Sequence, residues 1–203
     1  GIYAVMKGCF PLISVLFLVH FTRPSWSFSA SFAMTEAGIP HGLRAQKSVQ
    51  PDYLRIILVR HGESTNNVLA KRVEEKYSSG SLTLEQARAE WFEQRSDDPD
   101  LTDKGRNQAR MLAQVLAPQM SDGFNRVVLV SSPMRRAMRT AQPLAEALGR
   151  SVLVHPEMFE SGGCYSKDLG PGAGGSRKDI RGEFGETYDT RMLPEEGRWN
   201  GEL

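Results

Sequence analysis

Three short apolar runs divide the chain, and each is rich in β-branched residues and bounded by turn-forming residues. They cover residues 54–60, 126–132 and 151–155. Apolar runs of this length with flanking turn residues are typical of strands in the interior of a parallel sheet. We therefore predict a buried strand at each of the three runs.

Apolar residues recur at helical spacing between these runs. The pattern predicts helices over residues 102–117 and 134–148, each with one apolar stripe. Thr102 is placed to cap the start of the first helix, and Gly149 follows the second, where glycine commonly ends a helix.

A further helix is predicted over residues 84–95, inside a polar insertion that covers residues 68–100. Thr83 precedes this helix and Gln86 follows three residues later, which is the spacing of a capping box. The alternation of strands and helices predicts an α/β fold, a three-layer sandwich with a mostly parallel sheet and helices on both faces. Such sheets bind ligands beyond the carboxyl ends of their strands.

The first fifty residues have a different composition from the rest of the chain. An apolar run over residues 10–21 follows Lys7 and precedes small residues, as in a signal peptide, and it is short for a membrane span of about 20 residues. We expect a targeting-like, low-complexity segment over residues 1–50 and one folded domain over residues 51–203. A targeting role would direct the protein to the secretory pathway or to an organelle such as a plastid. Without that role, for example if translation starts at Met34, the protein would be cytoplasmic.

The overall charge and the cysteines exclude several classes of function. The formal net charge of the 203-residue chain is +1, so no large field favours nucleic acid or a membrane surface. Cys9 and Cys164 stand far apart without metal-ligand spacing, and neither a disulfide framework nor a zinc site is indicated. We therefore expect no metal, no cofactor and no stable membrane span, and the sequence carries no indication of oligomeric state.

Arg60, His61 and Gly62 follow the first predicted strand in the stretch RHGES. An arginine fork suits phosphate oxygens, and a neutral imidazole is a nucleophile that can accept a phosphoryl group. Gly62 is expected to turn the backbone tightly and to leave amide groups free for an anion. A hydrogen-bonded structural histidine is the alternative interpretation of His61.

A second basic stretch, SSPMRRAMRTA, follows the second predicted strand and opens the helix over residues 134–148. Pro133 suits the first turn of a helix, so Arg135 and Arg136 are expected near a helix N-terminus, where anions bind. A solvated helix face is the alternative. Two such sites after two parallel strands favour phosphate binding.

The stretches RHGESTNN, DPDLTDKGRNQA and SSPMRRAMRTA, in this order, resemble the histidine phosphatase superfamily, also called the phosphoglycerate mutase family. The resemblance implies a phosphoglycerate mutase-like fold. It also implies that His61 becomes phosphorylated, and that Arg60, Asn67 and Arg136 bind the phosphate.

The resemblance further implies a glutamate that protonates the leaving group, because a leaving alkoxide requires a proton. Glu160 is the better match and Glu157 is the second choice, whereas Glu63 is expected to hydrogen-bond locally.

The family pattern includes a second histidine on a later strand, and none of the other three histidines fits it. His20 and His41 precede the motifs, and His155 belongs to the third predicted strand. We interpret the chain as lacking the C-terminal part of the domain. The phosphate cage of this 203-residue chain is then incomplete.

The leading hypothesis is a phosphomonoester hydrolase that acts on a small phosphorylated substrate through a phosphohistidine. One alternative is a phosphoglycerate mutase-type phosphotransferase, and the long insertion over residues 68–100 favours the phosphatase. The other is a catalytically inactive, phosphate-binding member of the family, which the absence of the second histidine favours.

Overall fold

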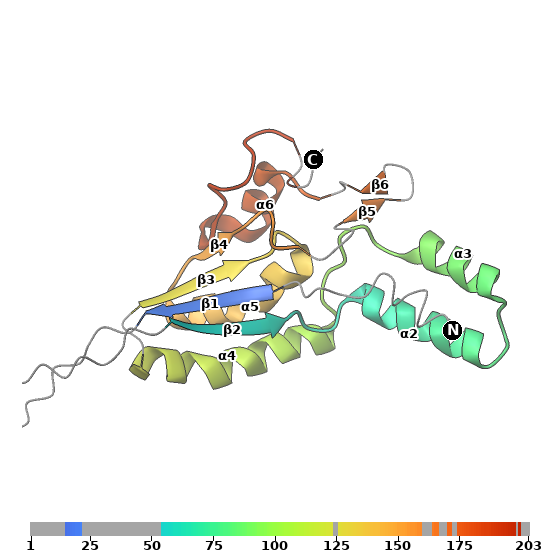
Figure 1. Cartoon of the computed structure of the whole chain (residues 1–203), viewed down its shortest axis with the longest axis horizontal. Helices are drawn as coiled ribbons and strands as arrows, with labels where there is room; N and C mark the ends of the chain where they lie inside the picture. The colour runs from blue at the N-terminus through green and yellow to red at the C-terminus, as the bar shows by residue number, and fades with distance from the viewer. Residues whose placement is uncertain are drawn as a thin grey trace, which may run out of the picture.

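The computed structural model describes residues 15–21, 54–123, 126–159, 164–166, 170–171, 174–197 and 199. Five strands form the main sheet, in the order β2-β1-β3-β4-β7, and two short strands, β5 and β6, pair separately (Figure 1). The strands are β1 (Val15–Phe21), β2 (Leu54–Arg60), β3 (Arg126–Ser131), β4 (Val152–Val154), β5 (Tyr165–Ser166), β6 (Gly170–Pro171) and β7 (Tyr188–Asp189). The helices are α2 (Thr65–Ser78), α3 (Leu84–Gln94), α4 (Asp103–Gly123), α5 (Arg135–Leu148), α6 (Arg177–Phe184) and the 3-10 turn η1 (Gly185–Thr187).

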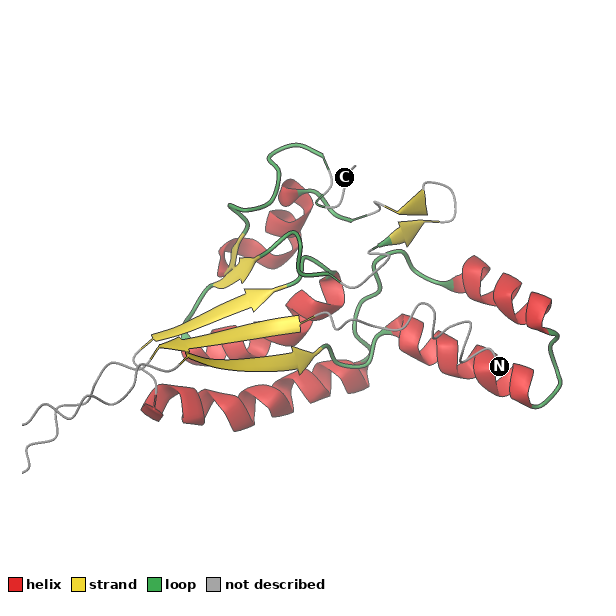
Figure 2. Cartoon of the chain, in the orientation of Figure 1, coloured by secondary structure: helices red, strands yellow, loops and turns green. Residues whose placement is uncertain are grey.

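Four of the five strands of the main sheet run in one direction. β1 is antiparallel to both β2 and β3, so those two strands point the same way, and β4 and β7 continue parallel to β3. The predicted α/β class with a mostly parallel sheet is therefore confirmed (Figure 2). The carboxyl ends of β2 and β3 consequently lie at the same end of the sheet, and both motifs that are predicted to bind phosphate begin there.

The apolar run expected as a targeting segment contributes β1 to this sheet. Val15–Phe21 lies between β2 and β3, with Phe17 opposite both Leu58 and Val130. A targeting role for this run and a domain boundary at residue 50 stay predictions. The described part of the chain contains no helix that combines the length and apolarity required to span a bilayer.

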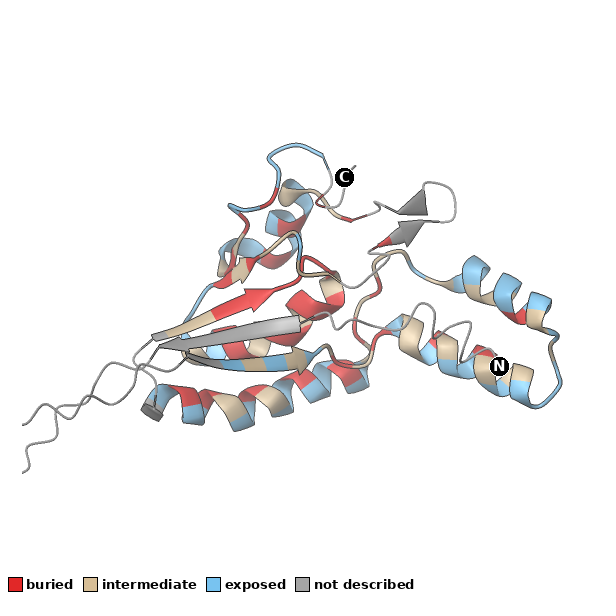
Figure 3. Ribbon diagram, in the orientation of Figure 1, coloured by how far each residue is buried: buried red, intermediate tan, exposed pale blue. Residues whose placement is uncertain are grey.

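The main core lies between the sheet and helices α4 and α5 (Figure 3). Thr102 accepts a hydrogen bond from the Gly105 amide at 3.0 Å and caps α4 as predicted, and Gly149 ends α5 with a positive φ of 58°. The inward side chains of β2, Ile57 and Val59, pack against this core, whereas Ile56 and Leu58 are exposed. β2 therefore directs one face toward the helices. The prediction of a buried interior strand at this run is wrong, because β2 lies at the edge of the described sheet and its other face is exposed.

Helices α2 and α3 form an arm beyond the end of the sheet (Figure 1). The arm has its own small apolar cluster around Leu69, Val73 and Ala87. The predicted capping box of α3 is present, because the Thr83 hydroxyl accepts from the Gln86 amide and the Gln86 side chain accepts from the Thr83 amide. The polar insertion is thus a helical hairpin that leaves and rejoins the domain beside the RHGES turn.

Candidate active site

His61 follows β2 directly and is only partly exposed. Its Nδ1 atom lies 2.7 Å from the carbonyl oxygen of Gly62. A carbonyl oxygen only accepts hydrogen bonds, so Nδ1 carries the proton and Nε2 keeps its lone pair. Burial, with a further contribution from the nearby Arg136 charge, lowers the pKa of His61 from 6.5 to about 4. At neutral pH the ring is therefore uncharged and has a free nucleophilic nitrogen.

We expect His61 to remain neutral in the folded protein down to about pH 5 and to be half protonated near pH 4. The unfolded chain binds a proton at this residue near its ordinary pKa of 6.5. The free energy of unfolding is therefore expected to fall as the pH drops from 6.5 through 4. An NMR pH titration of the His61 ring measures this directly. A midpoint at or above 6.5 would contradict the described environment.

The backbone turn that carries His61 is fixed by side chains from other segments. The amide of Gly62 donates to the Thr140 hydroxyl at 3.0 Å, and the amide of Glu63 donates to Gln108 Oε1 at 2.8 Å. The next amide, that of Ser64, donates to Asn67 Oδ1 at 3.0 Å. The expectation that these amides are free for an anion is wrong, because the fold uses all three to hold the turn.

Gly62 is required for space rather than for an unusual backbone conformation. Its φ is not positive, but a Cβ at this position would lie 2.6 Å from the carbonyl oxygen of Gly105. A Cβ on Gly105 would in turn lie 2.1 Å from the carbonyl oxygen of Glu63. The first turn of α4 therefore contacts the turn that carries His61 backbone to backbone, and only two glycines permit this approach.

Glu63 forms local hydrogen bonds at the start of α4. Thr102 Oγ1 donates to its Oε1 at 2.9 Å, and Lys104 Nζ donates to its Oε2 at 3.0 Å. The hydrogen bond from Lys104, followed by that from Thr102, lowers the pKa of Glu63. An ionised carboxylate with these donors is not a proton source.

Arg136 is buried in the first turn of α5, with 5% of its surface exposed. Its charge acts on His61, and Arg60 at the exposed end of β2 adds to that effect. The structure thus brings two of the predicted phosphate-binding arginines close to the predicted nucleophile. Asn67 serves in the capping box of α2 through its Oδ1 atom, which leaves its Nδ2 group as the part that can bind a phosphate oxygen.

The neighbouring arginines of α5 serve a different purpose. Arg135 and Arg139 both bind the carboxylate of Glu183, at 2.5 and 2.7 Å. These two ion pairs connect α5 to α6, and the backbone amide of Arg135 donates to the carboxylate of Asp98. The N-terminus of α5, expected as an open anion site, therefore already holds a carboxylate from the protein itself.

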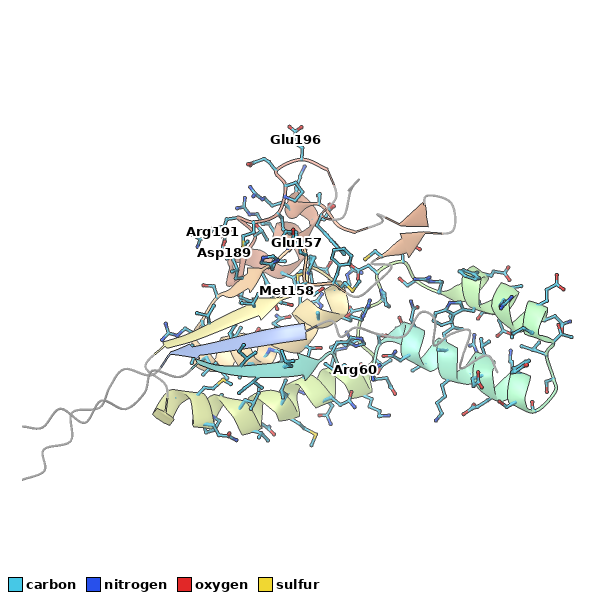
Figure 4. The ribbon with its side chains drawn as sticks, viewed as in Figure 1. Arg60, Glu157, Met158, Asp189, Arg191 and Glu196 are labelled. Carbon is cyan, nitrogen blue, oxygen red and sulfur yellow. The ribbon has the colours of Figure 1, made fainter. Side chains whose placement is uncertain are left out.

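The predicted general acid, Glu160, lies outside the described residues. The second choice, Glu157, is exposed and follows β4. It lies apart from Arg60, which ends β2 (Figure 4). His155 was predicted within the third strand but lies directly after β4, where its amide donates to the Ser131 carbonyl oxygen and its Nδ1 accepts from the Glu157 amide. Of the other histidines, His20 lies in β1 and His41 lies outside the described residues. The described residues include no group of three His, Cys, Asp or Glu side chains arranged to hold a metal ion.

Sequence reasoning missed four residues that shape the site. Thr140 and Gln108 hold the turn, Gly105 allows α4 to approach it, and Asp98 caps α5. For three of these residues, the spacing from a recognised residue could have indicated the role. Thr140 stands one helical turn after Arg136, and Gly105 and Gln108 lie three and six residues after the cap Thr102, on the face of α4 that begins at the turn.

A model of the histidine phosphatase superfamily (branch 1) matches residues 56–196. The chain is 32% identical over 107 residues to phosphoserine phosphatase 1 of Hydrogenobacter thermophilus, covering 53% of this chain and 38% of that protein. It is 35% identical over 107 residues to a probable phosphoglycerate mutase of Serratia proteamaculans, again covering 53% and 38%. It is 28% identical over 131 residues to a 2,3-bisphosphoglycerate-dependent phosphoglycerate mutase of Bartonella tribocorum, covering 64% and 50%.

The matched part of the chain spans half or less of the length of these relatives. No solved structure matches the chain. The family model nevertheless covers more than half of the sequence, from β2 to the segment after β7. The chain therefore belongs to the histidine phosphatase superfamily.

Proposed function

We propose that the protein hydrolyses phosphomonoesters through a phosphohistidine on His61. The observation that carries the proposal is the state of His61, which is buried beside Arg136 and kept neutral, with Nδ1 bonded to Gly62. A neutral imidazole held in one tautomer presents Nε2 to an electrophile without first losing a proton. A merely structural histidine does not need a buried arginine beside it.

The proposed reaction has two steps. In the first, Nε2 of His61 bonds to phosphorus, and the bond from phosphorus to the leaving oxygen breaks. Arg60, Arg136 and the Nδ2 group of Asn67 bind the phosphoryl oxygens, and Glu160 donates the proton that the leaving oxygen takes. In the second step, water attacks phosphorus while the bond between Nε2 and phosphorus breaks, and the Glu160 carboxylate takes one proton from the water. Inorganic phosphate leaves, and neutral His61 and protonated Glu160 are restored.

Removing the Arg136 charge should impair this reaction strongly. We expect Arg136→Met to lower kcat/KM by about 10²-fold or more, because a buried charged donor to the transferring group is lost. The same change should raise the pKa of His61, since Arg136 is the second-largest cause of its lowering. Arg150→Lys is the control, because Arg150 is exposed after α5. Unchanged kcat/KM and an unchanged His61 pKa in Arg136→Met would contradict the assignment.

A phosphotransferase of the mutase type is the second candidate, and the names of two relatives favour it. The two activities differ in the fate of the phosphoryl group. A hydrolase releases inorganic phosphate from a simple phosphomonoester in water, whereas a mutase keeps phosphohistidine until a second substrate hydroxyl accepts the group. The arm over α2 and α3 is a large insertion at the edge of the site, and it supports the hydrolase as the first choice.

The test is a single-turnover experiment with a panel of phosphomonoesters, in which protein-bound phosphoryl group and inorganic phosphate are followed together. The hydrolase predicts release of phosphate within the time of substrate loss. A stable phosphoryl-protein that is discharged only by added acceptor alcohol would support the mutase. Binding of phosphate without either event would support the inactive phosphate-binding protein.

A further inference from the structure

Asp98 is a half-buried carboxylate that the proposed reaction does not use. It lies in the segment that returns from α3 to α4, and its two oxygens accept the backbone amide of Arg135 at 3.0 and 3.3 Å. The N-cap residue of α5, Met134, provides no side-chain hydrogen bond of its own to the helix. A residue from a distant part of the chain therefore caps the helix that carries Arg136.

The same returning segment is also attached to the turn that carries His61. The Thr65 amide donates to the Asp100 carbonyl oxygen at 3.0 Å, and the Thr102 amide donates to the Glu63 carbonyl oxygen at 2.9 Å. The segment thus contacts the nucleophile's turn through its backbone and the start of α5 through Asp98. It connects the two elements that supply the predicted phosphate site.

The charge of Arg136 affects the pKa of both His61 and Asp98. It contributes to the lowered pKa of His61, and it opposes the rise in the pKa of Asp98. Burial is the larger effect at Asp98 and raises its pKa from 3.8 to about 6. The charged and titratable groups that face Asp98 are Arg135 and Arg136 of α5, Glu183 of α6 and the buried Cys164 thiol.

We propose that Asp98 is a positioning residue for phosphate binding: its ionised carboxylate fixes the first turn of α5 and holds the Arg136 guanidinium toward the site. The inference rests on the proposed function insofar as the ligand of Arg136 is a phosphoryl group. It goes beyond that function because the affinity for phosphate then depends on the charge of Asp98, a residue that does not itself bind the phosphate.

The raised pKa of Asp98 indicates that its ionised form is less favourable in the folded protein than its protonated form. Between pH 3.8 and about 6 the folded protein holds the Asp98 proton more tightly than the unfolded chain does. Stability gained from that proton is present at low pH and is lost as the pH rises through 6. At pH 8 the ionised carboxylate therefore costs stability, and Asp98→Asn is expected to unfold at the same temperature as the wild type or higher. A purely structural cap would give the opposite result.

The test compares inorganic phosphate binding to the wild type and to Asp98→Asn by calorimetry at pH 8 and pH 5. Asparagine keeps an oxygen for the Arg135 amide and removes only the charge. At pH 8 we expect the variant to bind phosphate more weakly by about tenfold, which corresponds to about 1.4 kcal/mol, because the charge that orients Arg136 is removed. At pH 5 the wild-type carboxyl is itself protonated, so the two dissociation constants should converge. Phosphate is ionised to the same extent in both measurements at a given pH, so the ratio of the two dissociation constants does not depend on its ionisation.

Asp103→Asn is the matched control, because Asp103 is fully exposed in the first turn of α4 and, within the described part of the chain, forms an ion pair only with Arg106. It should bind phosphate as the wild type does at both pH values. Equal affinity of Asp98→Asn and the wild type at pH 8 would overturn the proposal. Tighter binding by the variant would also overturn it, because Asp98 would then act as a competing anion.

The phosphate-binding readout separates this inference from the proposed reaction. If the wild type binds phosphate but does not turn over phosphomonoesters, the hydrolase fails while the ratio still decides the role of Asp98. If Asp98→Asn does not fold, the Arg136 side-chain NMR signal of the phosphate-bound wild type serves instead. It should shift with one midpoint at or below pH 6, because phosphate that binds the ionised form more tightly lowers the pKa of Asp98 from about 6. An unchanged signal across that range would reject the positioning role.

Discussion

Replacement of His61 by asparagine should lower phosphomonoester turnover by at least about 10³-fold, because the phosphoryl acceptor is removed and no described side chain can replace its Nε2 atom. Asparagine retains a polar group at the end of β2, so the variant should fold with a melting temperature close to that of the wild type. The measurement is phosphate release under saturating substrate, together with thermal unfolding of each protein.

His155→Asn is the control for this experiment. His155 is the other histidine whose side chain the structure describes, and it lies directly after β4, where its Nδ1 accepts from the Glu157 amide. It should retain wild-type turnover within about a few fold, as expected for a residue outside the reacting groups. Equal loss in both variants, or retained turnover in His61→Asn, would show that the nucleophile is elsewhere.

Substitution of Gly105 by alanine is expected to have the largest effect on stability. The added Cβ would lie 2.1 Å from the Glu63 carbonyl oxygen, and this neighbour is backbone that cannot rotate away. We expect a loss of about 2–4 kcal/mol in the free energy of unfolding, because α4 must shift from the catalytic turn. Turnover should fall in the fraction that remains folded, since the displaced turn carries His61.

Gly182→Ala is the matched control for that substitution. Gly182 also lies in a helix, α6, and an added Cβ there has no atom within 4 Å. Alanine favours helix over glycine by up to about 1 kcal/mol, so this variant should be as stable as the wild type or more so. Urea unfolding of the two variants measures the difference. A Gly105→Ala protein within about 0.5 kcal/mol of the wild type would refute the close backbone contact.

The strands and helices with strong periodicity were predictable because their side chains are sorted by burial. α4 and α5 each present one apolar face to the core, and that sorting is visible in the sequence. β2 and β3 were recognisable as apolar runs, although the sequence does not show that Ile56 and Leu58 face outward. α2 was not predicted, because it buries only Leu69 and Val73 and most of its other residues are polar. Its signal was the capping pair Ser64 and Asn67, which the phosphate interpretation of Asn67 obscured.

The apolar run that forms β1 shows a limit of local composition. A signal-peptide core and an inner strand are both short, apolar and followed by small residues, so periodicity does not separate them. The pairing of Val15–Phe21 with both β2 and β3 depends on segments that are more than thirty residues away in the chain.

The reactive residues of the site were easier to predict from the sequence than the residues that hold them in place. His61 and Arg136 were recognisable from residue type and position after a strand, and the structure brings them within electrostatic reach. The contacts of Thr140, Gln108 and Asp98 join segments from 37 to 78 residues apart, so no local pattern specifies them. The same contacts explain why the amides after His61 are engaged in the fold rather than open to an anion.

The most direct test of the central claim is to mix the protein with a phosphomonoester, quench the reaction in alkali within milliseconds and map the bound phosphoryl group by mass spectrometry. The account predicts an acid-labile phosphoryl group on the peptide that contains His61, and on no other histidine. Release of inorganic phosphate without phosphorylation of His61 would contradict it, as would a phosphoryl group on another residue.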